Sequence, residues 1–201
     1  MTSARRAVSV MQIFPEQGER LADALRLLCD TLGKGAYTQA DLEALVRSPE
    51  SLVLGATRVP HAGPLVAVAV AQRLSPDGLS YYDRFGRAAC AILDRHTVGS
   101  LAALAVQPNL RGQGIGQRLT EEVIRWLRQM GCDLIVAISW VSGGSNPSRP
   151  LFEKLGFRYI AEAPDVYLAD SLERGLVCDF CGGACHCSGI LYILDRRGVM
   201  P

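Results

Sequence analysis

The sequence lacks an excess of charge of either sign. Its 201 residues carry 21 lysines and arginines against 20 aspartates and glutamates, for a formal net charge of +1 at pH 7. No long run of like charges stands anywhere in the chain. Proteins that bind nucleic acid or an anionic membrane surface usually present a basic patch or stripe. The even balance therefore argues against both kinds of partner.

Long hydrophobic runs, internal repeats and low-complexity tracts are also absent. No uninterrupted apolar run approaches the ~18 residues that a membrane-spanning helix needs. The apolar stretch at residues 7–14 is too short and too polar for a signal peptide, because Ser9 and Gln12 interrupt it. We therefore expect a cytoplasmic protein. With 49% apolar and 20% charged residues, residues 1–201 are expected to form a single globular domain with a sizeable core.

What the chain does have is a glycine-rich turn between an apolar stretch and an amphipathic one. Residues 101–106 predict a strand and residues 117–130 predict a helix. Between them, Gly112, Gly114 and Gly116 stand at alternate positions. Glycine lets the backbone turn tightly and leaves N–H groups free at a helix N-terminus, where the helix dipole favours an anion. The pattern predicts a turn that binds pyrophosphate.

Two common phosphate-binding motifs do not fit this turn. A P-loop requires Gly-Lys-Ser/Thr after the glycines, and that sequence is absent. A dinucleotide-binding turn requires G-x-G-x-x-G and an acidic residue at the end of the next strand. Here the glycines alternate, and Asp133 precedes the next strand.

The turn resembles instead the acetyl-CoA-binding motif of the GNAT N-acetyltransferase superfamily, Q/R-x-x-G-x-G/A, which residues 111–116 match completely. Residues 151–157 are similar to the family's later helix and its Gly-Phe exit. With the strand between them, the two segments span about residues 98–160. The resemblance implies transfer of an acetyl group from acetyl-CoA directly to an amine, which would be a small molecule, a peptide N-terminus or a lysine. A chance glycine-rich turn in another α/β protein is the alternative.

The hydrophobic pattern predicts an α/β fold, in which a mixed sheet of about six to seven strands is flanked by helices. Strands are predicted at residues 9–14, 51–57, 65–74, 98–106, 133–139, after 157 and at 190–194. Helices are predicted at residues 17–32, 38–47, 116–130 and 150–155, and turns at 60–64 and 76–78. Residues 79–97 fit either a helix at 84–94 or a long loop over the substrate site. This order fits the GNAT fold, in which two central parallel strands splay apart to admit the cofactor.

By resemblance, the backbone amides of the glycine-rich turn would hold the pyrophosphate of acetyl-CoA. The turn consists of Arg111, Gly112, Gln113, Gly114, Ile115 and Gly116. The pantetheine arm would pair with the strand edge at Leu104 and Val106, and the N–H of Val106 would polarise the thioester carbonyl. The alternatives are plain core packing for the side chains of Leu104 and Val106 and a solvated surface position for Arg111.

The catalytic acid and base are not evident. Many family members use a tyrosine in the later helix to protonate the leaving thiolate, but the matching residue here is Phe152. The candidate acids are Ser148, Tyr159 and Tyr167, and the thiolate leaving without an acid is the alternative. Residues 99–104 contain no acidic residue where some relatives carry a glutamate. The candidate bases are His96, Asp94 and Asp83, or water.

Four of the seven cysteines lie within ten residues, at Cys178, Cys181, Cys185 and Cys187. The part Cys-x-x-Cys-Gly-Gly resembles a zinc knuckle, and four thiolates fit one tetrahedral site. We expect about one structural zinc per chain. Disulfide or redox chemistry and unliganded thiols are the alternatives, and a cytoplasmic location disfavours stable disulfides. The cluster is not part of the GNAT pattern, and it falls between the last two strands, where it would border the acceptor pocket.

Three functions therefore remain open. The first is an N-acetyltransferase that uses acetyl-CoA. The second is a degenerate GNAT domain that binds acyl-CoA without turnover and acts as a sensor. The third is an interaction module built around the cysteine cluster. The sequence identifies neither the amine acceptor nor the oligomeric state, and it leaves a homodimer open.

Overall fold

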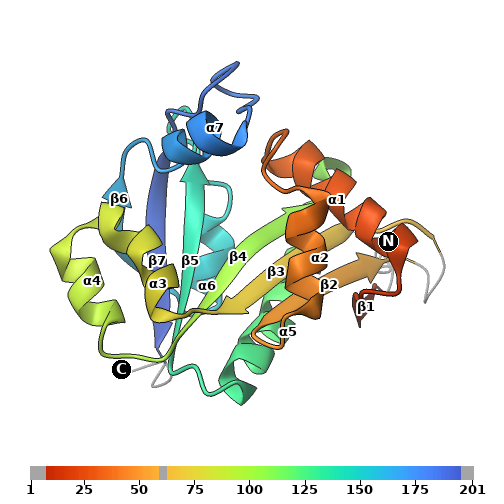
Figure 1. Ribbon diagram of the computed structural model, residues 1–201, viewed down its shortest axis with the longest axis horizontal. Coiled ribbons are helices and arrows are strands. Elements are labelled where there is room, and N and C mark those ends of the chain that lie inside the picture. The colour runs from red at the N-terminus through yellow and green to blue at the C-terminus, as the bar shows by residue number, and fades with distance from the viewer. Residues whose placement is uncertain (1–7, 59–62, 196–201) are drawn as a thin grey trace, which may run out of the picture.

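The computed structural model describes residues 8–58 and 63–195, in which seven strands form one mixed sheet. The strand order is β1-β2-β3-β4-β5-β7-β6, and β4 and β5 form the only parallel pair among the described residues (Figure 1). The strands are β1 (Ser9–Gln12), β2 (Ser51–Thr57), β3 (Ala67–Arg73), β4 (Val98–Val106), β5 (Leu134–Val141), β6 (Arg158–Ala163) and β7 (Ser188–Asp195). This architecture confirms the predicted fold class.

Helices cover both faces of the sheet (Figure 1). On one face, α1 (Gly18–Leu32) and α2 (Gln39–Arg47) lie over β2 to β4. On the same face, the 3₁₀ helix η1 (Ser80–Phe85) and α4 (Arg87–Leu93) lie over β5 to β7, preceded by α3 (Pro76–Leu79). The opposite face is covered by α5 (Ile115–Gln129) and α6 (Arg149–Lys154). At one end of the sheet lies α7 (Leu168–Arg174). No helix in the described residues is long and apolar enough to cross a membrane.

Local sequence signals explain the start of α2 and the boundary between η1 and α4. Thr38 caps α2 through a capping box, because its Oγ1 accepts from the N–H of Asp41 at 3.1 Å and its own N–H donates to the Asp41 carboxylate at 2.8 Å. The segment 79–97 is helical rather than a long loop, but its helix begins at Arg87 instead of residue 84. Gly86 has a φ of +88°, a conformation that interrupts a right-handed helix and separates η1 from α4.

Two parts of the sequence prediction need correction. Residues 76–78 form the first turn of α3, with the Ser75 hydroxyl accepting from the N–H of Gly78 at 3.2 Å, rather than an isolated turn. The sequence pattern also missed α7, which has only seven residues and no buried side chain. The turn predicted at residues 60–64 lies mostly outside the described residues.

The parallel strands β4 and β5 separate half-way along their length. They pair from Val98↔Leu134 to Leu101↔Ala137 and no further. At that point β4 carries a bulge, because Leu101 pairs with Ala71 and Ala103 pairs with Val70, which leaves Ala102 unpaired. The expected splay of the two central strands is therefore present, and it opens the sheet at their C-terminal ends.

Close packing of α5 on β4 requires a glycine at position 99. A Cβ at Gly99 would lie 2.6 Å from Leu127 Cδ2 and 3.1 Å from Cys132 Sγ, and both of these side chains are buried. We expect Gly99→Ala to lower the free energy of unfolding by about 1–3 kcal/mol in urea titration, because neither neighbour has room to move. The control is Gly18→Ala, whose added Cβ meets no atom within 4 Å. Equal stability of the two variants would contradict the packing argument.

Candidate active site

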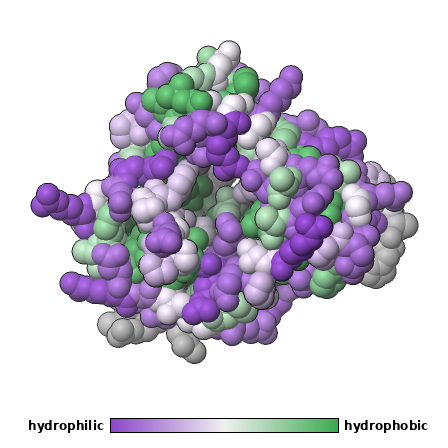
Figure 2. Space-filling model, in the orientation of Figure 1, coloured by the Kyte–Doolittle hydropathy of each residue, from purple (hydrophilic) through white to green (hydrophobic). Residues whose placement is uncertain are grey.

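A cavity of about 700 Å³ lies where β4 and β5 separate. Its walls come from both helical groups on the front face, from α7, and from α6, which reaches it through the gap in the sheet. Figure 2 shows this face hollowed between α7 and α2. A hollow beside an open strand edge gives space for a long, thin ligand and for a second substrate that meets it.

The edge of β4 that faces this gap has unpaired backbone groups. Along a strand, the N–H and C=O groups of successive residues point to opposite sides. The N–H of Gln107 donates to Val66 O of the β3 side at 3.0 Å, so Val106 faces the other side. Consistent with this, Val106 O accepts from Arg111 Nε at 3.2 Å. The N–H groups of Val106 and, two residues earlier, Leu104 are therefore presented to the space that β5 vacates.

The glycine-rich turn continues directly from this edge into α5. Gly112 and Gly114 have φ values of +73° and +82°, which only glycine adopts readily, and Gly114 is the N-cap residue of α5. In the described structure, the backbone N–H groups of residues 112–116 donate to no protein acceptor. Residues 111–114 of the turn are exposed, Gly116 is half-buried, and Ile115 packs into the core. It thus offers free amides and a helix N-terminus to an anion.

The first turn of α5 packs against β4 at Gly116. A Cβ at this position would lie 3.5 Å from both Leu104 Cδ2 and Val106 Cγ2, so the first turn of the helix lies directly against the open strand edge. The structure brings all of the predicted cofactor residues, Leu104, Val106 and 111–116, to one continuous backbone surface. The side chains of Leu104 and Val106 pack against the core, as the alternative interpretation expected.

A family model, the acetyltransferase (GNAT) family, matches residues 38–157 of the chain. The chain belongs to the GNAT acetyltransferase family. The protein is accordingly an acyltransferase whose cosubstrate is acetyl-CoA. The match includes the splayed strands, the glycine-rich turn and α6. A search of curated protein sequences finds no match.

Solved acetyltransferase structures have the same fold as this GNAT protein. The IAA acetyltransferase from Bacillus cereus is 17% identical with a TM-score of 0.60, over 94% of this chain and 99% of the other. NAA60 from Arabidopsis thaliana, solved with acetyl-CoA, is 16% identical with a TM-score of 0.66, over 96% and 100%. The Drosophila melanogaster polyamine N-acetyltransferase is 21% identical with a TM-score of 0.60, over 94% and 100%. At these identities the likeness concerns the fold.

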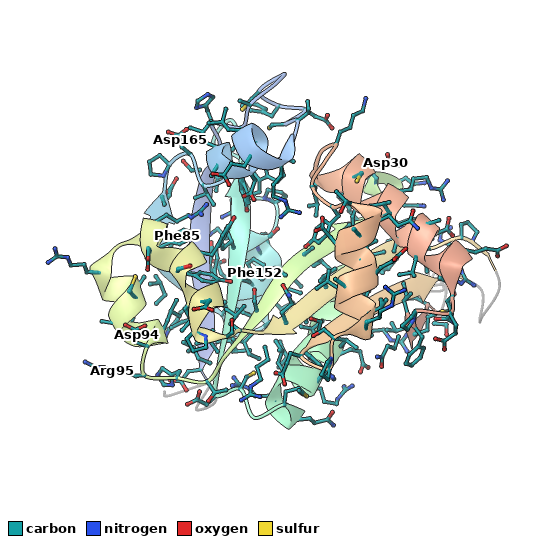
Figure 3. The ribbon with its side chains drawn as sticks, viewed as in Figure 1. Asp30, Phe85, Asp94, Arg95, Phe152 and Asp165 are labelled. Atoms are coloured by element: carbon teal, nitrogen blue, oxygen red, sulfur yellow. The ribbon has the colours of Figure 1, made fainter. Side chains whose placement is uncertain are left out.

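Two of the predicted acids of the GNAT protein lie at the cavity. Ser148 precedes α6 and lines the cavity, and its side chain makes no capping hydrogen bond. Phe152, one turn later, is 3% exposed and also lines the cavity, near the centre of the molecule in Figure 3. Tyr167 forms part of the opposite wall and packs on Trp140, with ring centroids 4.8 Å apart.

The other candidate acids and bases lie elsewhere. His96 pairs with Asp133 at 2.8 Å beside the N-terminal ends of β4 and β5, whereas the cavity opens at their C-terminal ends. Figure 3 shows its neighbour Asp94 at that lower end of the molecule. Tyr159 lies on the outer strand β6 and is 57% exposed. Asp83 is exposed and accepts a hydrogen bond from the Cys90 thiol at 3.4 Å. None of these four residues lines the cavity.

Sequence reasoning missed Tyr81 and Tyr82, two further tyrosines of the cavity wall. Tyr82 is buried and shares a hydrogen bond of 3.0 Å with the hydroxyl of Ser100 in β4. Tyr81 donates to Asp170 at 3.3 Å, and its ring lies under the Arg84 guanidinium at 3.9 Å. The signal that could have identified them is that Tyr81 and Tyr82 are adjacent aromatic residues in segment 79–97, which the sequence left open between a helix and a loop. Their position over the cavity depends on the helical path of that segment.

Burial keeps these hydroxyl groups protonated. Burial raises the pKa of Tyr82 to about 12, although the hydrogen bond with Ser100 opposes the shift. Burial likewise raises the pKa of Tyr37, which lines the cavity beside α2, to about 12. The pKa of Tyr167 is raised well above its usual value, again by burial. At neutral pH these tyrosines are hydrogen-bond donors and not general bases.

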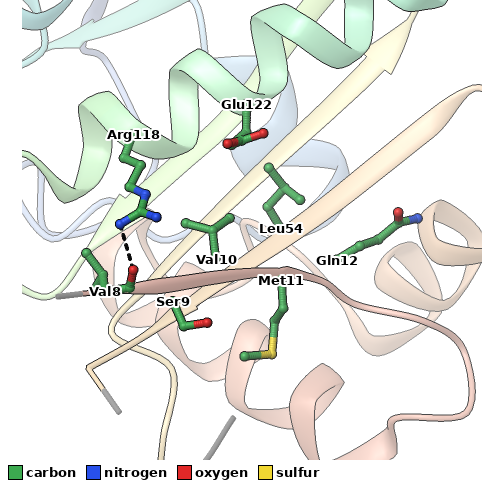
Figure 4. A pocket seen from close by; sticks show the side chains of 8 residues that line it. All are labelled: Val8, Ser9, Val10, Met11, Gln12, Leu54, Arg118 and Glu122. Atoms are coloured by element: carbon green, nitrogen blue, oxygen red, sulfur yellow. Dashed lines mark hydrogen bonds between the residues drawn. The ribbon is translucent and has the colours of Figure 1, made fainter. Parts of the chain in front are cut away.

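A second, shallower pocket of about 470 Å³ lies between β1 and α5 (Figure 4). Arg118 of α5 points across it and donates to Val8 O at 2.7 Å, while Glu122 lies one turn further along the helix. This pocket does not border the splayed strands or the glycine-rich turn. The larger cavity is therefore the candidate acceptor site.

The four predicted metal ligands also come together. The sulfur atoms of Cys178, Cys181, Cys185 and Cys187 all lie within 4.8 Å of one another, in the connection between β6 and β7. Cys29, Cys90 and Cys132 lie apart from this group, as expected for unrelated thiols, and Cys132 is buried in the core.

Proposed function

We propose that this protein transfers the acetyl group of acetyl-CoA directly to an amine that enters the large cavity between α2 and α7. The observation that carries the proposal is the continuity between the open edge of β4 and the unpaired amides of the glycine-rich turn. One ligand that carries both a pyrophosphate and an extended amide-containing arm satisfies both sets of donors. The acetyl end of that arm would then meet the cavity at Ala102 to Leu104.

The chain's own groups supply orientation and electrostatic stabilisation. The amides of residues 112–116 and the N-terminus of α5 bind the pyrophosphate. The N–H of Val106 donates to the thioester carbonyl and stabilises the negative charge that develops on its oxygen. The amine nitrogen attacks the carbonyl carbon, and the carbon–sulfur bond then breaks. The leaving sulfur takes a proton from the hydroxyl of Ser148, which regains one from water, so that CoA leaves as the free thiol. The cavity tyrosines stay protonated and so do not act as the base; the proton of the amine passes to water.

Release of free thiol from acetyl-CoA, measured over a panel of amines, tests the proposal. The panel contains a diamine, peptides with free N-termini and a lysine peptide with a blocked N-terminus. We expect acceptor-dependent thiol release with at least one of them. Binding of acetyl-CoA without turnover on any acceptor would favour the acyl-CoA sensor instead. One observation favours that alternative. Phe152, which cannot donate a proton, is buried at the position where many relatives carry the tyrosine that protonates the leaving thiolate.

Ser148 is the proposed acid for the leaving thiolate. Ser148 precedes α6 and lines the cavity, and its hydroxyl makes no capping hydrogen bond. We expect Ser148→Ala to lower turnover about 100-fold, the lower end of general acid catalysis, with unchanged affinity for acetyl-CoA. Ser145→Ala is the matched control, because Ser145 is exposed in the preceding loop and does not line the cavity. Normal turnover by Ser148→Ala would mean that the thiolate leaves without this acid.

A further inference from the structure

The cysteine loop, residues 178–187, is unused by the acetyl-transfer chemistry, and its sulfur atoms converge. Cys178, Cys185 and Cys187 are at most 4% exposed, and Cys181 closes the group from the exposed side. Cys178 and Cys181 lie in a tight turn, and Cys185 and Cys187 lie in the segment that leads into β7. In the turn, the N–H of Cys178 donates to Gly183 O at 2.9 Å, and Gly182 adopts a φ of +73°. The backbone of this turn therefore brings the thiols together in a conformation that depends on glycine.

The spacing of the sulfur atoms fits one tetrahedral metal ion. Zinc–thiolate bonds of about 2.3 Å in a tetrahedron place the sulfurs about 3.8 Å apart. The Cys178–Cys187 and Cys181–Cys187 sulfurs are separated by 3.8 Å and 3.6 Å. A disulfide bond requires about 2.05 Å. We propose that Cys178, Cys181, Cys185 and Cys187 bind a single structural Zn²⁺ ion. The ion fixes the roof of the acceptor cavity, by which we mean the segment from α7 to the cysteine loop.

Backbone amides support the same sulfurs, as they do in zinc knuckles. The N–H of Cys181 points at Cys178 Sγ at 3.4 Å, and the N–H of His186 points at Cys181 Sγ at 3.4 Å. Such donors stabilise thiolate ligands and orient them. His186 itself is turned away to Asp165, at 2.9 Å, so the ligands are the four thiolates. A four-thiolate tetrahedron selects zinc among the common divalent ions that do not undergo redox chemistry.

The cysteine loop is joined to the structures that close the cavity from above. The N–H of Cys185 donates to the hydroxyl of Ser171 in α7 at 2.9 Å. Just before the loop, the N–H of Val177 donates to Lys34 O at 2.8 Å, between α1 and α2. From α7, Arg174 reaches Asp41 of α2 at 2.7 Å. The chain from α7 to the cysteine loop thus bridges the two walls that diverge where β4 and β5 separate.

This bridge fits closely against the loop between α1 and α2. A Cβ at Gly33 would lie 2.6 Å from Val177 O, and a Cβ at Gly35 would lie 2.6 Å from Gly175 O. Three buried sulfurs pack with Leu176 in a small cluster that also contacts Trp140 and Tyr167 of the cavity wall. Such a small cluster provides little apolar burial of its own, so a metal ion is the main source of its rigidity.

Metal content and coordination of the full-length wild-type protein, purified with zinc in the medium, test the site directly. We expect about one zinc per chain by elemental analysis and four sulfur neighbours at about 2.3 Å by X-ray absorption. Metal-free protein with four free thiols, a disulfide among these cysteines by mass spectrometry, or iron in place of zinc would each overturn the proposal. These measurements need no variant, so they do not depend on the folding of one.

A pair of cysteine variants then locates the ion. Cys181→Ser removes the most exposed ligand, and we expect its zinc content to fall to near zero and its melting temperature to drop. Cys90→Ser is the control, because Cys90 is a partly exposed thiol outside the cluster, and it should retain about one zinc per chain. Full zinc content in Cys181→Ser would exclude the four-thiolate site.

The role of the ion as a roof clamp rests on the proposed function and needs its own measurement. Removal of zinc from the wild-type protein should raise the KM for the amine severalfold and leave the Kd for acetyl-CoA unchanged, because the glycine-rich turn lies outside the cysteine loop. Equal amine KM with and without zinc would refute the clamp. Bound zinc in a protein that acetylates no amine would refute the proposed function and leave the metal site standing.

Discussion

Replacement of Gly114 by leucine should weaken acetyl-CoA binding at least about 100-fold, or about 2.7 kcal/mol, measured by isothermal titration calorimetry. Gly114 is the N-cap residue of α5 with a φ of +82°, and no protein atom lies within 4 Å of an added Cβ. The open space beside it is where the pyrophosphate would lie against the free amides. A leucine side chain fills that space, and its strain turns the amides away from the ligand.

Gly131→Leu is an unusually close control for this experiment. Gly131 follows the other end of the same helix, has the same φ of +82° and is equally open around its Cβ position. Both leucines therefore impose a similar backbone strain of about 1–2 kcal/mol on the folded protein. Only Gly114→Leu should lose acetyl-CoA binding. Unchanged affinity in Gly114→Leu, or an equal loss in both variants, would show that the pyrophosphate does not bind at this turn.

Replacement of Val106 by proline should reduce turnover by about 10²–10³-fold. The N–H of Val106 faces the open edge of β4, where it would donate to the thioester carbonyl, and proline removes that donor. Because the N–H does not point at β3, proline deletes no hydrogen bond of the β3–β4 ladder. We therefore expect folded protein with slow acetyl transfer, checked by thiol release and by the melting curve.

Val106→Ala separates the backbone effect from the loss of a side chain. Alanine keeps the N–H and removes only the methyl groups that pack near Gly116. It should lower stability modestly and retain most of the turnover. Wild-type turnover in folded Val106→Pro would remove the proposed oxyanion donor, whereas a matching loss in Val106→Ala would assign the effect to packing.

The glycine-rich turn could be predicted well from the sequence because its conformation is set locally. Gly112 and Gly114 are required by the backbone angles of a turn of a few residues, and that turn lies next to its strand and its helix in the chain. No distant contact is needed to create the free amides. The same locality explains why α2, with its Thr38–Asp41 capping box, was predicted correctly.

Local sequence could not show which of the catalytic candidates lie at the cavity. His96 lies just before a predicted strand and Ser148 just before a predicted helix. Only the parallel pairing of β4 with β5 places His96 far from the cavity and Ser148 beside it. Tyr82 and Tyr167 are separated by 85 positions in the numbering, yet both line one cavity. Their high pKa values arise from burial, which is a property of the packed structure.

The sequence by itself determined the conformation of the glycine-rich turn, the order of the seven strands and the longer helices, and the four cysteines as a group, since each depends on neighbouring residues. Tertiary structure alone decided three other features: the separation of β4 from β5 at Ala102, the tyrosine-lined cavity, and the bridge from α7 to the loop before α2. The physical reason is the range of the contacts involved. Backbone conformation in a turn depends on adjacent residues, whereas a cavity exists only where elements far apart in the chain fail to meet.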